Sequence, residues 1–305
     1  MNLDKKNKLI RDLYDEYYSV VGCTLSRRSA EHYKQEFTNF LKWAMISDIL
    51  ETDQVTDEVA ERYIRYSYSI KRSAPFEIAT LKRIWSVCLP GQYNPWTQKL
   101  YNLLRINTET PMNHRPFTHK ECVKIFSDIH GEWRYALMFA YWYGMRIGSV
   151  CNLKWKDFKG WKRTKMFVHL PPKTARVKPV YLELPIVPEI EWILTHINKL
   201  DNEYVFPTMK LRYEASITSM CHFFKATTIR CRIKDTMIGI ASMHSFRTTF
   251  VTRMDEAGAP SYITDSITGH AARDMHGLYS RPSARAKRKW IMKAIKPIGI
   301  EKLKD

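Results

Sequence analysis

Residues 244–279 read HSFRTTFVTRMDEAGAPSYITDSITGHAARDMHGLY. Four side chains in this stretch suit chemistry on a phosphate: His244, Arg247, His270 and Tyr279. Histidine transfers protons near neutral pH, arginine binds anionic oxygens and tyrosine can attack as a nucleophile. Arg247 precedes His270 by 23 residues, and Tyr279 follows His270 by 9. The stretch therefore predicts a phosphate-processing site that needs further cations from elsewhere in the chain.

Two upstream segments supply such cations. In Tyr143-Gly-Met-Arg146-Ile-Gly-Ser, the arginine lies in a glycine-flanked break between two expected helices. Lys173 lies in the basic turn of a hairpin expected from the β-rich runs 165–170 and 177–184. Arg176 and Lys178 share this turn, so the sequence leaves open which of the three acts.

Each of these residues also has a structural interpretation when it is taken alone. Arg146 can cap a helix C-terminus and His244 a helix N-terminus, whereas His270 can cap or pack. Lys173 can be an exposed turn residue, and Tyr279 is one of 17 tyrosines. The order and spacing of the whole set favour the chemical interpretation.

The chain resembles the tyrosine recombinases, the phage-integrase family of site-specific DNA recombinases. The family's catalytic set of Arg, Lys, His-x-x-Arg, His and Tyr corresponds in order to Arg146, Lys173, His244, Arg247, His270 and Tyr279. Residues 26–104 look like the family's helical core-binding domain, and Phe117-Thr-His-Lys-Glu looks like the start of its catalytic domain. Ser149 departs from relatives that often carry an acid there, which weakens a supporting contact.

The expected fold class is mainly α with a small β-hairpin. Helices are expected over 4–20, 29–46, 56–70, 75–88, 131–143, 189–199, 215–230, 245–257 and 260–268. The resemblance implies four parts: a helical core-binding domain (1–105), a linker (106–116), a mixed α+β catalytic domain (117–283) and a basic C-terminal helix or tail (284–305). An apolar stripe on the tail at Trp290, Ile291, Ile295 and Ile298 could fold back on its own domain or dock on a neighbouring protomer, and the resemblance favours the neighbour.

Net charge points to a polyanionic partner. The chain carries 49 Lys and Arg against 31 Asp and Glu, a net of +18. Six basic residues cluster within 22 positions that contain one acid, Glu77, and form the expected DNA-binding set: Arg62, Arg65, Lys71, Arg72, Lys82 and Arg83. Tyr63, Tyr66 and Tyr68 are interleaved with them and could pack on sugars or bases. A solvated helix face is the alternative for this cluster.

The resemblance implies an enzyme that cuts and rejoins DNA through a 3′-phosphotyrosine and a Holliday junction, without metal, cofactor or ATP. Its partners would be double-stranded DNA and three further copies of the chain, four protomers on two DNA sites, with accessory DNA-bending factors as additional candidates. The same chemistry serves dimer resolvases, transposon recombinases and telomere resolvases, and type IB topoisomerases are relatives in mechanism. A catalytically silent DNA-binding factor is the alternative from another class.

Composition excludes several other classes. Hydrophobic residues make up 45% of the chain, which is enough for packed cores. The six cysteines form no C-x-x-C pair, and no uncharged apolar run approaches the ~18 residues of a membrane span. No secretory signal is recognised. We therefore expect a reduced protein without membrane contact, cytoplasmic and DNA-associated in a bacterial, archaeal or viral host cell.

Overall fold

The computed structural model describes residues 7–70, 74–97, 100, 113–172, 180–270 and 280–303. The chain divides into two compact units, 1–111 and 112–305, named the N-terminal unit and the C-terminal unit below. Their boundary falls inside the expected linker 106–116.

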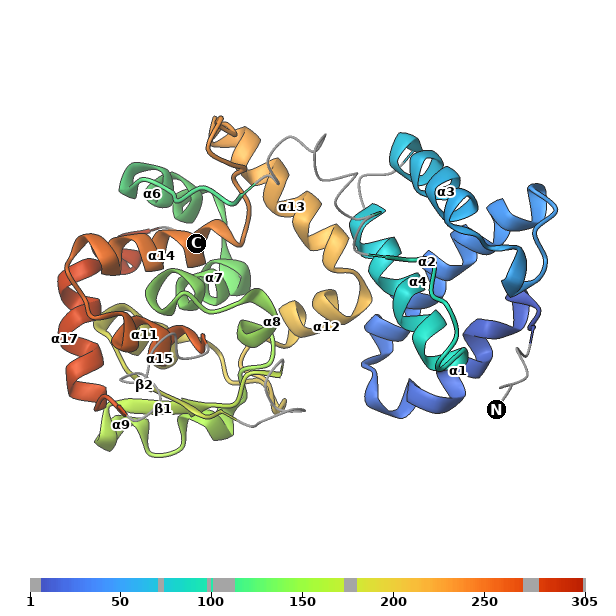
Figure 1. Ribbon diagram of the computed structural model, residues 1–305. Coiled ribbons are helices and arrows are strands. Elements are labelled where there is room, and N and C mark those ends of the chain that lie inside the picture. Colours follow the sequence, from blue (N-terminus) through green and yellow to red (C-terminus); the bar gives the residue numbers. More distant parts are fainter. Residues whose placement is uncertain are drawn as a thin grey trace. The chain divides into compact units, whose positions relative to one another are not determined.

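The N-terminal unit is helical in its described residues (Figure 1). Its elements are η1 (Ile10–Asp12), α1 (Leu13–Val21), η2 (Gly22–Thr24), α2 (Arg27–Ile46), η3 (Thr52–Gln54), α3 (Asp57–Ile70) and α4 (Ala74–Cys88). Hydroxyl groups begin two of these helices: Ser26 Oγ accepts the N–H of Ser29 at 3.0 Å, and Thr56 Oγ1 that of Val59 at 3.4 Å. Each satisfies a donor that the first helical turn leaves unpaired, which is why α2 and α3 begin where they do.

Aromatic rings from α2, α3, α4 and the stretch after α4 form the centre of this unit. Phe40 of α2 is fully buried, and its ring meets Tyr63, Trp85 and Trp96 edge-on at 4.9, 5.9 and 5.1 Å between centroids. Each such pair contributes about 0.5–1.5 kcal/mol beyond the burial of area. The N-terminal unit is thus held by a dense aromatic core.

The C-terminal unit holds the other elements (Figure 1). They are α6 (His119–Asp128), α7 (Gly131–Tyr143), α8 (Ile147–Val150), η4 (Trp155–Phe158), α9 (Trp161–Thr164), β1 (Met166–His169), β2 (Leu182–Pro185), α11 (Pro188–His196), α12 (Pro207–Ala215), α13 (Ile217–Arg230), α14 (Ser245–Glu256), α15 (Ser261–Thr268), α17 (Ala284–Ala294) and η5 (Ile300–Lys302). Figure 1 shows α7 and α14 side by side in the middle of the unit. The expected fold class is confirmed, because a mainly helical chain carries one small antiparallel hairpin among its described residues.

Helix α7 is the core helix of this unit, and ten of its thirteen residues are buried. A helix that is apolar on every side belongs in an interior. It ends at Gly144, whose φ of 60° is the left-handed conformation that glycine adopts without steric penalty. A Cβ there would lie 2.8 Å from Phe250 Cδ1 of α14, so this turn also needs glycine for space.

The hairpin pairs β1 with β2 in antiparallel register, from Met166 opposite Pro185 to His169 opposite Leu182. The helix expected over 215–230 is confirmed as α13, whereas α12, which precedes it, was not expected. Ser216 separates them in an extended conformation, and its hydroxyl caps α13 by accepting the N–H of Ser219 at 3.1 Å.

The end of the expected linker belongs to the C-terminal unit. His114 bridges to Ile240, and the N–H of Arg115 donates to the Ile240 carbonyl at 3.1 Å. The Arg115 guanidinium is buried and donates to Glu121 Oε1 and to the Lys234 carbonyl, both at 2.7 Å. Residues 113–116 therefore form part of the packed unit, and they do not act as a free linker.

The C-terminal tail packs on its own chain. Ile291, Ile295 and Ile298 of the expected stripe are buried in the core of the C-terminal unit. The Glu189 carboxylate accepts the N–H groups of Ile298 and Ile300 at 3.1 and 3.0 Å. These contacts place the three isoleucines in the core of their own unit, as in the alternative in which the tail folds back, whereas Trp290 is only half-buried.

Candidate active site

The turn after α7 positions the first arginine. Gly144 reverses the chain, Arg146 takes an extended conformation at the start of α8, and its side chain is half-buried. Arg247 of α14 donates from Nη1 to the Gly144 carbonyl at 2.7 Å. The two arginines that the sequence placed 101 residues apart therefore meet at one turn.

Arg247 is an unusual buried cation. Its residue is 4% exposed, and its Nη2 is buried without a hydrogen-bond partner among the described residues. Burial, followed by the positive charge of Arg146, lowers the pKa of Arg247 to about 10, whereas Asp265 acts in the opposite direction. The group is still cationic at neutral pH, and a buried cation with an unpaired donor is favourable only when an anion completes the site.

His244 stands at the start of α14, and its side chain makes no capping hydrogen bond. His244 is thus the N-cap residue by position, but its imidazole is left available for other contacts. The residue is exposed as a whole, but its ring lies against that of His114, with the centroids 4.8 Å apart. Loss of water on that side, together with the nearby His114, Arg247, Arg146 and His270 groups, lowers the pKa of His244 to about 4. The imidazole is therefore neutral at pH 7.

His270 follows the left-handed Gly269 that ends α15. The ring Nδ1 of His270 lies 3.4 Å from Asp265 Oδ1 and 3.2 Å from Thr268 Oγ1. The backbone N–H of His270 donates to the Asp265 carbonyl at 3.2 Å. Burial and the positive Arg247 lower the pKa of His270, although Asp265 opposes the change. The carboxylate orients the ring, as carboxylates commonly do for functional histidines.

Lys173 and Tyr279 lie outside the described residues, as do Arg176 and Lys178. The structure describes the elements that flank them. A Cβ on Gly269 would lie 3.4 Å from Leu182 Cδ1, so the last described pair of the hairpin adjoins the turn that carries His270. The site that is described thus consists of Arg146, His244, Arg247 and His270.

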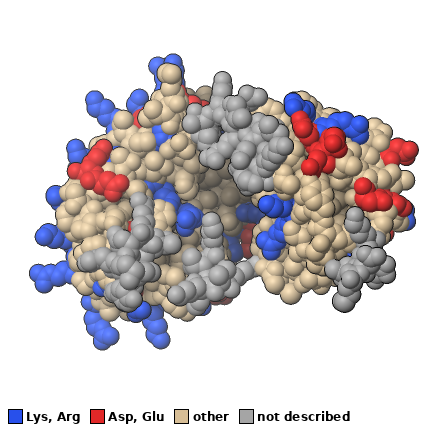
Figure 2. Space-filling model, in the orientation of Figure 1, with Lys and Arg blue, Asp and Glu red and all other residues tan. Residues whose placement is uncertain are grey.

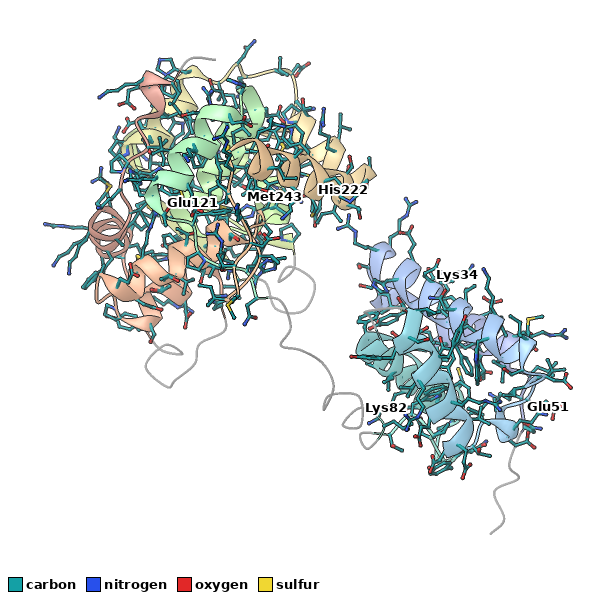
Figure 3. All side chains as sticks on the ribbon, turned by 90° about the horizontal axis from the view of Figure 1, so that it is seen from above. Lys34, Glu51, Lys82, Glu121, His222 and Met243 are labelled. Carbon is teal, nitrogen blue, oxygen red and sulfur yellow. The ribbon has the colours of Figure 1, made fainter. Side chains whose placement is uncertain are left out.

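The expected DNA-binding set is only partly described, since Lys71 and Arg72 lie outside the described residues. The other four are exposed: Arg62, Arg65, Lys82 and Arg83. Lys82 lies at the surface of the N-terminal unit (Figure 3), whereas Arg65 pairs with Glu61 at 2.5 Å.

The tyrosines among these basic residues do not share one environment. Tyr63 is buried and donates its hydroxyl to Glu77, so it is not available to bases. Tyr66 and Tyr68 remain exposed. The acid that the sequence placed among the basic residues, Glu77, is itself buried.

Four contributors to the site were missed by sequence analysis. They are His114, Arg115, Ser242 and Asp265: His114 and Ser242 contact His244, Asp265 lies beside His270, and Arg115 anchors the segment that carries His114. The first two lie in the stretch interpreted as linker. Asp265 precedes His270 by five residues. A glycine that ends a helix turns the chain back toward the last helical turn, so Gly269 could have indicated that His270 lies beside Asp265.

Comparison with known proteins identifies the family. Residues 115–285 match the family described as the phage integrase family, which is more than half of the chain. The chain belongs to the phage integrase family. It is by family a tyrosine site-specific recombinase, an enzyme that cleaves and rejoins DNA strands. None of the curated proteins matches the chain by sequence.

Solved integrase structures share the fold. A lambda integrase dimer bound to a COC′ core site is 14% identical with a TM-score of 0.67, covering 92% of this chain and 79% of that one. The Tn1549 transposon integrase in complex with transposon right end DNA is 16% identical with a TM-score of 0.65, covering 94% and 99%. A lambda integrase tetramer bound to a Holliday junction is 14% identical with a TM-score of 0.67, and the match covers 93% of this chain and 82% of that one.

Proposed function

We propose that this recombinase cuts and rejoins double-stranded DNA at specific sites through a 3′-phosphotyrosine intermediate. The observation that carries the proposal is the buried guanidinium of Arg247, with its unpaired Nη2 beside Arg146, His244 and His270. A phosphodiester supplies the missing anion. Two guanidinium groups can hold its oxygens, because each presents N–H donors in a planar fork and stays charged.

The remaining groups complete an in-line transfer. The Tyr279 hydroxyl oxygen attacks the scissile phosphorus, a tyrosine–phosphate bond forms on the 3′ side, and the bond from phosphorus to the 5′ oxygen breaks. Lys173 gives a proton to the departing 5′ oxygen. The phenol proton passes to a neutral imidazole of the His244 and His270 pair, which their lowered pKa values keep able to accept it. The reverse steps rejoin a strand without ATP.

We further infer an assembly of four protomers on two DNA sites, with strands exchanged through a Holliday junction. Support comes from the chain's net charge of +18 and from the fold shared with a lambda integrase tetramer bound to such a junction. Among the charged side chains on the visible face of the C-terminal unit, Figure 2 shows mostly basic ones and few acidic ones. Counterion release from phosphates favours association with DNA through such surfaces.

The exposed basic residues Arg62, Arg65, Lys82 and Arg83 support a DNA contact by the N-terminal unit as well. Integration, dimer resolution, transposition and telomere resolution would all use the same catalytic steps. They differ in how the sites are arranged in the DNA.

The test begins with selection of bound sequences from random duplexes. The selected duplex is then nicked beside the expected cleavage point, so that a short fragment diffuses away and traps the adduct. The parent chain should become covalently joined to the 3′ phosphate, and Tyr279→Phe should bind the same DNA without forming the adduct. Binding without an adduct in the parent would instead establish a silent DNA-binding factor.

A further inference from the structure

His114 lies against the active site but belongs to none of the catalytic motifs. Its ring faces that of His244 at 4.8 Å between centroids, with 50° between the ring planes. Its Nδ1 lies 2.8 Å from Ser242 Oγ. The two histidines are 130 residues apart in the sequence, so this contact exists only in the folded unit.

Ser242 Oγ links the two histidines by hydrogen bonds. It accepts the backbone N–H of His244 at 3.1 Å and lies 2.8 Å from the Nδ1 of His114. In the tautomer that carries its proton on Nε2, the Nδ1 of His114 accepts the serine hydroxyl hydrogen. One side chain thus holds His244 in two ways, by ring contact and through the serine at its backbone.

His114 is itself fixed on a rigid support. Ile240 donates its N–H to the Asn113 carbonyl at 2.8 Å and accepts the N–H of Arg115 at 3.1 Å, so the histidine lies between two backbone hydrogen bonds. Gly239 permits this approach, because a Cβ there would lie 2.0 Å from the Asn113 oxygen. The buried side chain of Arg115 anchors the same segment to Glu121, the N3 residue of the Thr118 capping box.

We propose that His114 is a positioning residue that orients His244 toward the scissile phosphate, acting through Ser242 and through the ring contact. The inference rests on the proposed function, since it assigns the geometry of one proton-transfer group in that reaction. A misplacement of about 1 Å at a reacting group lowers rates up to about a hundredfold. His114 therefore affects the rate of cleavage, whereas the basic surface sets the affinity for DNA.

The groups that face His244 are His114, Arg247, Arg146 and His270. Removing the imidazole of His114 admits water to one side of the His244 ring and takes away one of these neighbours. The pKa of His244 then moves back toward its ordinary value. The acid limb of the cleavage rate, where His244 becomes protonated, should move to higher pH in the same variant.

The experiment measures single-turnover adduct formation on the nicked duplex, at saturating DNA and across pH. His114→Ala should lower the rate about ten- to a hundredfold and shift the acid limb of the rate profile to higher pH. The DNA affinity and the melting temperature should be unchanged. His114→Asn, whose amide oxygen can replace the Nδ1 acceptor, should recover much of the rate. Ser242→Ala breaks the route through the serine and leaves the ring contact, so it should lower the rate by less than His114→Ala does. The double variant should be no slower than His114→Ala alone, because that change already removes both routes.

His196→Ala is the matched control, since this exposed imidazole stacks on Trp192 at 4.2 Å away from the site. It should cleave like the parent. The inference is overturned if His114→Ala cleaves within about twofold of the parent. It is equally overturned if the rate falls with an unmoved acid limb, or if the two single effects multiply. A parent chain that forms no adduct refutes the proposed function instead, so the two failures are separate.

Discussion

Two buried arginines of the C-terminal unit offer a direct test of which one serves function. Arg247 is 4% exposed and Arg134 is 1% exposed. Arg134 donates from Nε to the Ile129 carbonyl at 2.7 Å and from Nη2 to His130 Nδ1 at 2.9 Å. Arg247 makes one such bond, to Gly144, and its Nη2 has no partner among the residues described. Methionine replaces either side chain with a flexible apolar group of similar length.

The expected changes in the free energy of unfolding differ in size. Arg134→Met loses at least two hydrogen bonds from a charged donor, at about 1.5–3 kcal/mol each, so it should destabilise the unit by about 3 kcal/mol or more. Arg247→Met loses one such bond. The substitution also removes the free-energy cost of holding a buried cation. This cost is roughly 3 kcal/mol, as judged from the lowering of the Arg247 pKa to about 10. The two contributions nearly cancel, so stability should change by no more than about 1 kcal/mol.

Activity should show the reverse order. Loss of a preorganised donor to the reacting phosphate lowers the rate about 10²–10³-fold, so Arg247→Met should nearly abolish adduct formation. Folded Arg134→Met should cleave, at a temperature below its melting point. Sulfate should raise the melting temperature of the parent more than that of Arg247→Met, because an ion bound only by the folded state stabilises it. A loss of more than about 3 kcal/mol in Arg247→Met, or adduct formation at the parental rate, would refute the assignment.

The other predictions concern the general acid, the pH dependence of stability, the salt dependence of DNA binding and the C-terminal tail. With sulfur in place of the bridging 5′ oxygen, the leaving group needs no proton, so Lys173→Ala should regain cleavage on that substrate; rescue of Lys178→Ala alone would move the role along the turn. The lowered pKa of His244 means that the unfolded chain binds more protons below about pH 6.5, so stability should fall between about pH 6.5 and 4, and a melting curve unchanged over that range would contradict this. The logarithm of the DNA association constant should fall with log salt at a slope steeper than about −5, and an affinity independent of salt would exclude a broad phosphate contact. Deleting residues 286–305 should unfold the C-terminal unit in a thermal melt, because the deletion removes buried isoleucines and the partners of Glu189; a truncated chain that melts like the parent would show that the tail is not part of the core.

Local features of the fold were predictable because local chemistry determines them. Thr118 and Glu121 form the capping box that begins α6, α7 ends at Gly144 and the hairpin pairs as expected. Each depends on residues close together in the sequence. The family resemblance predicted six catalytic residues, and the structure brings the four described ones together: Arg146, His244, Arg247 and His270.

Contacts between distant segments were not predictable in the same way. His114 meets His244 only because residues 113–115 pair with the loop before α14. The composition of residues 113–115 fits a free linker as well as it fits a segment that pairs with another part of the chain. Tyr63 was misplaced for a related reason. Its position among basic residues suggested an outward ring, but the hydroxyls of Tyr63 and Ser67 satisfy the buried Glu77 carboxylate.

The tail connects these separate contacts. Its buried Lys287 donates to the Glu183 carbonyl of β2 at 2.8 Å and to the Ser266 carbonyl of α15 at 3.4 Å. In the sequence, β2 follows the turn that carries Lys173, and α15 ends two residues before His270. Helix α17 begins five residues after Tyr279. The Lys287 side chain therefore joins the elements that flank three of the proposed catalytic residues, and burial lowers the pKa of its amine.

The outward face of α17 has a different chemistry from the buried stripe. The exposed residues on it are Arg285, Arg288, Lys289, Met292 and Lys293. Since the isoleucines are already buried within the chain, a contact with a neighbouring protomer through this helix would use its basic face. Protomers that each carry +18 repel one another through such faces. The contact therefore requires acidic residues on the neighbour or DNA phosphates between the two, which makes assembly through α17 dependent on DNA and sensitive to salt.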